Sequence, residues 1–143
     1  MKILAFIPAR EGSKRISKKN VKPLASKPLI AYTIEAAEKS ERINRIVVST
    51  NSKEIAEIAK RHGAEIPFLR PDSISKDDST EMEFFEHALN WFSKNENYEP
   101  DLIVLLYPTS PFRTSKSIDR AIGEMISHPE ADSLRSIRLC SEH

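Results

Sequence analysis

The sequence has little of what holds a disulfide-bonded or membrane-spanning protein together. It contains one cysteine, Cys140, among 143 residues, so no disulfide can form within the chain. This favours a reducing compartment, and we expect a cytoplasmic protein. No apolar run approaches the ~18 residues that a membrane-spanning helix needs, and the apolar run near the amino terminus is too short for a secretory signal. We therefore expect no membrane partner.

Further absences narrow the chemistry. The four histidines show no metal-ligand spacing, so we assign no metal-binding residue within the chain. With three glycines in all, the sequence has neither a Gly-x4-Gly-Lys-Ser/Thr phosphate loop nor the Gly-x-Gly-x2-Gly pattern of dinucleotide-binding proteins. No repeat, low-complexity tract or linker divides the chain, and we expect one domain over residues 1–143.

What the sequence does have is a strongly basic amino-terminal segment. Residues 1–30 carry eight Lys or Arg and one acid, a net charge of +7, whereas the whole chain carries +1. The apolar residues 3–7 predict a buried strand that Pro8 ends, and the cations follow directly around Gly12. A strand that opens into such a loop favours phosphate binding over a merely solvated face. No aromatic residue interrupts these cations for base stacking, which argues against a nucleic-acid partner.

Alternating apolar patterns predict the order β-α-β-α-β-α-β along the chain. We expect strands over residues 2–7, 43–49, 65–69 and 101–106, with a final strand within 131–137. We expect helices over 29–38 and 115–127, from a cap at Asn51 to Gly63, and from a cap at Asp78 onward with Met82, Phe85, Ala88, Leu89 and Phe92 on the core face. This order predicts an α/β fold of three layers, with helices on both faces of a mostly parallel sheet.

Four loops follow the predicted strands, over residues 8–20, 50–52, 70–78 and 107–113. In a parallel sheet, ligands bind at the carboxyl ends of the strands. We therefore expect these four loops to meet on one side of the sheet and to form a nucleotide pocket.

One block of sequence carries a family resemblance. Residues 7–24, Ile-Pro-Ala-Arg-Glu-Gly-Ser-Lys-Arg-Ile-Ser-Lys-Lys-Asn-Val-Lys-Pro-Leu, resemble the opening signature of the acylneuraminate cytidylyltransferases, the CMP-sialic acid synthetase family. The similarity covers most of the chain, because it returns in residues 27–34, 46–50, 70–71, 77, 87–89 and 105–113. It implies a Rossmann-like nucleotidyltransferase fold, similar to that of the glycosyltransferase-A enzymes, and a bacterial enzyme of cell-surface polysaccharide biosynthesis.

The resemblance also implies a reaction and a set of residues. The family transfers a cytidylyl group from CTP to the anomeric hydroxyl of a nonulosonic, sialic-acid-like sugar acid and releases pyrophosphate. Two positions, Lys14 and Arg10, match the catalytic phosphate contacts. The nucleotide-binding positions that match are Arg10, Gly12, Ser13, Lys14, Lys19, Asn20, Arg70, Ser79 and Thr80, among which Asn20 would read the cytosine edge. The acceptor side would include Tyr107, Thr109 and Ser110.

Plainer structural roles compete with some of these assignments. Asn20 could be a turn residue, the Ser79–Thr80 pair could begin a helix, and Thr109 with Ser110 could form a turn braced by prolines. Tyr107 stands where many family members have a glutamine that contacts the sugar. The tyrosine favours a bacterial acceptor such as legionaminate or pseudaminate over N-acetylneuraminate.

Family members continue well beyond 143 residues. The resemblance implies that Mg²⁺ is required, that its ligands lie beyond residue 143, and that the later part completes the sugar pocket and a homodimer. We expect residues 1–143 to be an incomplete cytidylyltransferase domain that binds CTP weakly and does not turn over alone. The alternatives are another nucleotidyltransferase, for 3-deoxy-manno-octulosonate or a sugar-1-phosphate, or a nucleotide-binding module that has lost catalysis.

Overall fold

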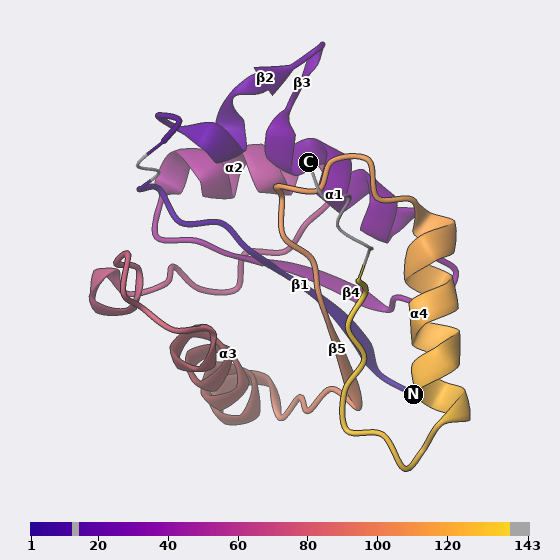
Figure 1. Cartoon of the computed structure of the whole chain (residues 1–143). Coiled ribbons are helices and arrows are strands. Elements are labelled where there is room, and N and C mark those ends of the chain that lie inside the picture. The colour runs from indigo at the N-terminus through magenta and orange to yellow at the C-terminus, as the bar shows by residue number, and fades with distance from the viewer. Residues whose placement is uncertain (13–14, 138–143) are drawn as a thin grey trace.

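The computed structural model describes residues 1–12 and 15–137 (Figure 1). In chain order the elements are β1 (Ile3–Pro8), the 3-10 turn η1 (Lys19–Val21), β2 (Pro23–Leu24), β3 (Lys27–Pro28), α1 (Leu29–Glu38), β4 (Arg45–Ser49), α2 (Lys53–Arg61), the 3-10 turn η2 (Asp72–Ile74), α3 (Glu81–Glu96), β5 (Leu102–Leu105) and α4 (Ser115–Ser127). Within the described ranges, no helix has the length and apolar character needed to cross a membrane.

Strand β1 lies at the centre of a parallel sheet with the order β4-β1-β5. All six of its residues are buried, which explains why the sequence there is an unbroken apolar run. The short strands β2 and β3 pair with each other as a separate antiparallel hairpin. The sheet is therefore organised around the strand that leads directly into the basic loop.

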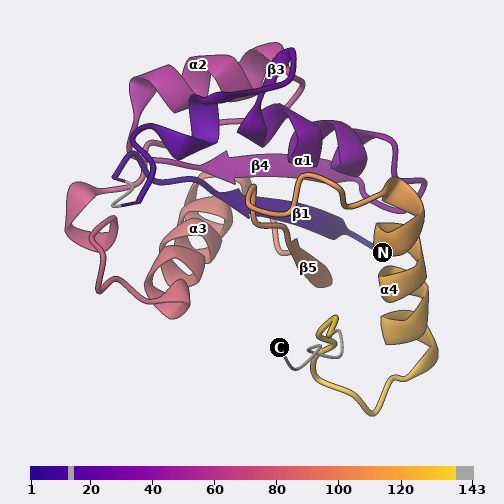
Figure 2. The ribbon, with the colours of Figure 1, turned by 45° about the horizontal axis from the view of Figure 1, so that its top comes forward.

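Helices cover both faces of the sheet (Figure 2). Alternate residues of β1 point to opposite sides, as the period of a strand requires. Ile3, Ala5 and Ile7 pack with α1, α2 and α4 in one apolar cluster. Leu4 and Phe6 pack with α3 in the other. The predicted α/β fold, with a parallel sheet between helical layers, is confirmed.

Two predicted strands are wrong. Residues 65–69 form only a single bridge, between Val47 and Glu65, and no strand. The physical reason is Pro67, which has no N–H to donate to a neighbouring strand. Residues 131–137 also form no strand, and Ile137 is 93% exposed. An apolar pattern without a paired neighbour and a covered face does not make a strand.

Two helix starts lie downstream of their predicted caps. Helix α2 is capped by Ser52 rather than Asn51, because the Ser52 side chain accepts a hydrogen bond from the N–H of Ile55. Helix α3 is capped by Thr80 rather than Asp78. The Thr80 hydroxyl accepts from the N–H of Glu83, whose carboxylate in turn accepts from the N–H of Thr80 at 2.6 Å. This reciprocal pair is a capping box.

The buried face of α3 also differs from the predicted one. Phe84, Ala88 and Phe92 are buried at intervals of four residues, as one face of a helix requires. Met82 is instead 63% exposed and Leu89 is 37% exposed, so these two assignments are wrong. Phe84 was missed because both Phe84 and its neighbour Phe85 fit an apolar face. Both rings contact Phe6, and burial distinguishes them, since Phe84 is buried and Phe85 is half-buried.

The capping box of α3 gives a first testable prediction. Thr80→Ala removes the oxygen that accepts from the helix N–H, and we expect it to lower the free energy of unfolding by about 1 kcal/mol. Urea denaturation measures this change. Thr109→Ala is the control, because Thr109 is exposed and caps no helix, and it should change stability by less than about 0.5 kcal/mol. Equal effects of the two substitutions would contradict a stabilising cap at Thr80.

Candidate nucleotide site

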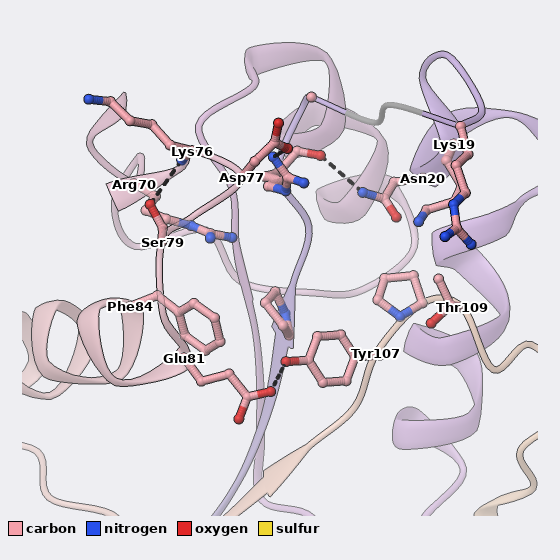
Figure 3. Close-up of a pocket in the computed structure, with 15 residues that line it drawn as sticks. Lys19, Asn20, Arg70, Lys76, Asp77, Ser79, Glu81, Phe84, Tyr107 and Thr109 are labelled. Atoms are coloured by element: carbon pink, nitrogen blue, oxygen red, sulfur yellow. Dashed lines mark hydrogen bonds and ion pairs between the residues drawn. The ribbon is translucent and has the colours of Figure 1, made fainter. Parts of the chain in front are cut away.

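Three loops meet at the carboxyl end of the sheet and enclose a cavity of about 480 Å³ (Figure 3). They are the loop after β1, the segment from Arg70 to the start of α3, and the loop after β5. A cavity of this size suits a small-molecule ligand. Its lining residues are Pro8, Arg10, Gly12, Arg15, Lys19, Asn20, Arg70, Lys76, Asp77, Ser79, Glu81, Phe84, Tyr107, Pro108 and Thr109.

The fourth predicted loop, residues 50–52, supports this cavity without lining it. Asn51 lies between two of the cavity loops and hydrogen bonds to both. Its Oδ1 atom accepts from the N–H of Glu11 at 3.0 Å, and its Nδ2 atom donates to Asp72 at 2.9 Å. One amide therefore fixes the spacing of the basic loop and the segment that follows Arg70.

The cavity is predominantly cationic. Among the described residues, five lysine or arginine side chains line it, against the two carboxylates of Asp77 and Glu81. Arg10 forms an ion pair with Asp77, with 2.6 Å between Nη1 and Oδ1. An enclosed surface with this excess of positive charge attracts anionic ligands.

Arg70 is the most unusual of these cations, because it is 5% exposed. One of its terminal nitrogens donates to the carbonyl oxygen of Ser49, and its guanidinium lies 5.2 Å from the centre of the Phe84 ring. In the described part of the chain its Nε has no hydrogen-bond partner and no carboxylate pairs with it. Burial, together with the nearby charge of Arg10, lowers the pKa of Arg70 to about 10. Arg70 is therefore a buried cation at neutral pH without a counterion in the described chain, as expected of an anion-binding residue.

Asn20 is buried at the opposite side of the cavity from Arg70 (Figure 3). Its Nδ2 atom donates to the carbonyl oxygen of Arg10 at 3.1 Å. A carbonyl can only accept, so this contact fixes which way the amide points. The Oδ1 atom contacts no donor among the described residues. Asn20 thus presents a hydrogen-bond acceptor to a ligand, at a position set by the basic loop.

Tyr107 and Glu81 form the lower wall of the cavity in Figure 3. The Tyr107 hydroxyl donates a hydrogen bond to the Glu81 carboxylate. Burial and this carboxylate raise the pKa of Tyr107 above its usual value, so the phenol stays protonated at neutral pH. The wall therefore combines an aromatic surface with a carboxylate that favours hydrogen-bond donors on the ligand.

The structure brings together eight of the site residues predicted from sequence, namely Arg10, Gly12, Lys19, Asn20, Arg70, Ser79, Tyr107 and Thr109. Thr80 does not line the cavity, because it caps α3. Ser110 does not line it either and is exposed, with its N–H directed to the carbonyl of Tyr107 at 3.4 Å. Ser13 and Lys14 lie outside the described residues.

Sequence reasoning missed several residues that line the cavity. Arg15, Lys76, Asp77, Glu81 and Phe84 are the clearest cases. Asp77 lies in the polar segment before α3, and Glu81 is the first residue of that helix, where acidic residues are common because they favour the helix N-terminus. The sequence offered one signal for these two residues, their position in or near the predicted loop 70–78, and every residue of that segment shares it.

No Mg²⁺ ligand was predicted among the described residues. Within them, no group of three or more His, Cys, Asp or Glu side chains is placed to hold a metal. The two carboxylates of the cavity are engaged by other side chains, Asp77 by Arg10 and Glu81 by Tyr107. The expectation that Mg²⁺ ligands lie beyond residue 143 stays a prediction.

The parallel sheet and the cationic cavity at its carboxyl end define an α/β protein with a site suited to anionic ligands. Comparison with protein families identifies the family within this class. Residues 4–139 match the family described as cytidylyltransferase, and the chain belongs to that family. The resemblance seen in the sequence is thereby confirmed.

Individual relatives agree with this family. The chain is 44% identical over 121 residues to the N-acylneuraminate cytidylyltransferase of Escherichia coli O18:K1:H7, covering 85% of this chain and 27% of that protein. It is 46% identical over 122 residues to the CMP-N,N'-diacetyllegionaminic acid synthase of Legionella pneumophila, covering 85% of this chain and 52% of that one. The chain thus spans about half the length of the Legionella relative, and less of the other.

A solved structure shows the same fold. The structure of CMP:2-keto-3-deoxy-manno-octonic acid synthetase complexed with CTP matches with a TM-score of 0.75, covering 90% of this chain and 49% of that chain. The two sequences are 19% identical, so this match supports the α/β nucleotidyltransferase fold alone.

Proposed function

We propose that this chain binds CTP and supplies the nucleotide half of an enzyme that transfers a cytidylyl group to a nonulosonic acid. The observation that carries the proposal is the fixed amide of Asn20, which leaves Oδ1 as an acceptor in a cationic cavity. Cytosine presents an amino donor where uracil presents a carbonyl acceptor. An acceptor held in place therefore favours cytosine over uracil.

The phosphates of CTP would lie among the cations of the basic loop. In the proposed reaction, the anomeric hydroxyl of the acceptor attacks the α-phosphorus and loses its proton. A new O–P bond forms, the bond to the bridging oxygen breaks, and pyrophosphate leaves. Such a step depends on positioning and on neutralising negative charge. Arg10 and Lys19 line the cavity and would hold the phosphates, with Lys14, outside the described residues, assigned to the leaving pyrophosphate.

The acceptor would lie against Tyr107 and Thr109. The Glu81 carboxylate beside them accepts hydrogen bonds and repels anions, so it would favour a hydroxyl or an acylamino N–H on the sugar. The similarity to a CMP-N,N'-diacetyllegionaminic acid synthase supports an acceptor of the legionaminate or pseudaminate type. For the whole protein we further propose a cytoplasmic homodimer that requires Mg²⁺.

Nucleotide selectivity tests the proposed function. We expect the chain to bind CTP at least about tenfold more tightly than UTP, because the wrong base leaves the Asn20 acceptor facing another acceptor. ATP and GTP should also bind more weakly than CTP. Isothermal titration calorimetry with the four nucleotides measures the affinities. Equal affinity for all four would leave only general attraction of phosphate and would contradict base recognition.

A further inference from the structure

We propose that Asp77 is an internal competitor for Arg10 that lowers the affinity of the cavity for pyrophosphate and favours its release. The inference rests on the proposed function, in which Arg10 binds a phosphate of CTP. It assigns to Asp77 a role in the release of pyrophosphate that is separate from the chemical step.

The contact between Asp77 and Arg10 carries the proposal. The carboxylate lies 2.6 Å from Nη1 of Arg10, and the side chains are 34% exposed for Arg10 and 42% for Asp77. Both residues line the cavity, so a phosphate that binds Arg10 enters the immediate surroundings of this carboxylate. It must either take the place of Asp77 on the guanidinium or bind beside a negative charge. Both outcomes weaken phosphate binding.

Hydrogen bonds on both sides of Asp77 fix its position in the segment between Arg70 and α3. On one side, Asp72 is tied to Asn51 by the hydrogen bond of 2.9 Å described above. On the other side, the Ser79 hydroxyl oxygen accepts from the N–H of Lys76 at 3.0 Å, which closes a turn around Asp77. Figure 3 shows Asp77 between Arg70 and Asn20, and it lines the cavity. The carboxylate is therefore held where an anionic ligand would bind.

A carboxylate at this position would help the cavity to release pyrophosphate after the reaction. Pyrophosphate carries high negative charge and would be held strongly by a cavity lined only with cations. Product release is a common limit on turnover. Because Asp77 can return to Arg10 as pyrophosphate leaves, it offers Arg10 an alternative partner and makes release more favourable.

Binding of inorganic pyrophosphate to the 143-residue chain tests the inference. We expect Asp77→Asn to bind pyrophosphate about two- to fivefold more tightly than the unsubstituted chain, as loss of a part-exposed ion pair predicts. The matched control is Asp78→Asn, which makes the same charge change one residue away. Asp78 is exposed and does not line the cavity, so its effect should be less than about 1.5-fold. Calorimetry gives the affinities, and circular dichroism checks that each variant is folded.

A double substitution separates competition for Arg10 from a general change of charge. In an Arg10→Met background, Asp77→Asn should tighten pyrophosphate binding less than it does in the unsubstituted chain, because there is no guanidinium to release and only the repulsion by the carboxylate is removed. Asp77→Ser provides a second variant with the same expected direction. The inference is overturned if Asp77→Asn leaves the affinity unchanged or weakens it, or if Asp78→Asn tightens binding equally. An undiminished gain in the Arg10→Met background, or no pyrophosphate binding by any variant, overturns it as well.

The same variants distinguish this inference from the proposed function. If CTP and UTP bind equally while Asp77→Asn still tightens pyrophosphate binding, cytosine recognition fails and the role of Asp77 stands. If CTP is preferred but Asp77→Asn changes nothing, the proposed function stands and the role of Asp77 fails.

Discussion

Replacing Arg70 with methionine is expected to lower the affinity for CTP about 10- to 100-fold, because a buried hydrogen bond to a charged group contributes about 1.5–3 kcal/mol. The same substitution should change the free energy of unfolding by less than about 1.5 kcal/mol. It removes the hydrogen bond to Ser49 and the contact with Phe84, and it also removes a buried charge that lacks a counterion in the described chain. Calorimetry and urea denaturation measure the two effects.

The pKa of Arg70 shows whether its charge stabilises or destabilises the folded state. Burial lowers the pKa of Arg70 to about 10, below its usual value, so the folded chain binds this proton less tightly than the unfolded chain does. The charge therefore destabilises the folded state, fully at pH values below about 10 and less as the pH rises toward the unfolded value. A bound phosphate supplies the missing negative charge. We therefore expect CTP to raise the unfolding temperature of the unsubstituted chain more than that of Arg70→Met.

Arg45 offers a matched control, since it is also largely buried but is fully paired. Its guanidinium contacts Glu65 at 2.8 Å and Glu96 at 2.5 Å, and it lies over the rings of Phe92 and Tyr98. Arg45→Met should lower the free energy of unfolding by about 1–3 kcal/mol and leave CTP binding unchanged. Similar losses of CTP affinity in both variants would show that the effect of Arg70→Met reflects general destabilisation.

Replacing Asn20 with alanine is expected to reduce the preference for CTP over UTP to about twofold or less. The substitution removes the Oδ1 acceptor and also releases the carbonyl of Arg10 from its hydrogen bond. Affinity for CTP should fall about tenfold, whereas affinity for UTP should change less because uracil has a carbonyl in place of the amino donor of cytosine. Competition calorimetry with both nucleotides measures the ratio.

Two further variants sharpen this test. Asn44→Ala is the control, because Asn44 accepts a hydrogen bond from Ile3 at 2.7 Å and does not line the cavity. It should lower stability without changing the nucleotide preference. Asn20→Asp keeps an acceptor but cannot donate to the Arg10 carbonyl, so it separates the two roles of the amide. An unchanged CTP to UTP ratio in Asn20→Ala would contradict cytosine reading by this residue.

The sequence was most informative where one physical demand dominates. An unbroken apolar run such as residues 3–7 is stable in a strand only when both faces of the strand are covered. Strand β1 is indeed buried on both faces. The basic loop follows it directly, so chain connectivity alone places Arg10 and Asn20 at the carboxyl end of the sheet. The central strand and the cationic side of the cavity were therefore predictable.

The acidic side of the cavity was not predictable, because its meaning depends on partners that are remote in sequence. Asp77 is paired with Arg10 and Glu81 with Tyr107 only because three loops meet in space. A local pattern could equally place such acids at a solvated helix start. The predicted buried face of α3 was wrong for a similar reason, since Phe84 and Phe85 both contact Phe6 and only Phe84 is buried, where it also lies against the remote Arg70.

During synthesis on the ribosome, β1 gains its two neighbours at widely separated moments. The last residue of β4, Ser49, precedes the first residue of β5, Leu102, by 53 positions. At synthesis rates of about 5–20 residues per second, β5 is completed roughly 3–10 s after β4. The edge of β1 that pairs with β5 stays unpaired for that time. That edge is apolar and able to pair with another chain in the interval. Slow translation between residues 50 and 101 should therefore raise aggregation of the nascent chain more than slow translation after residue 105.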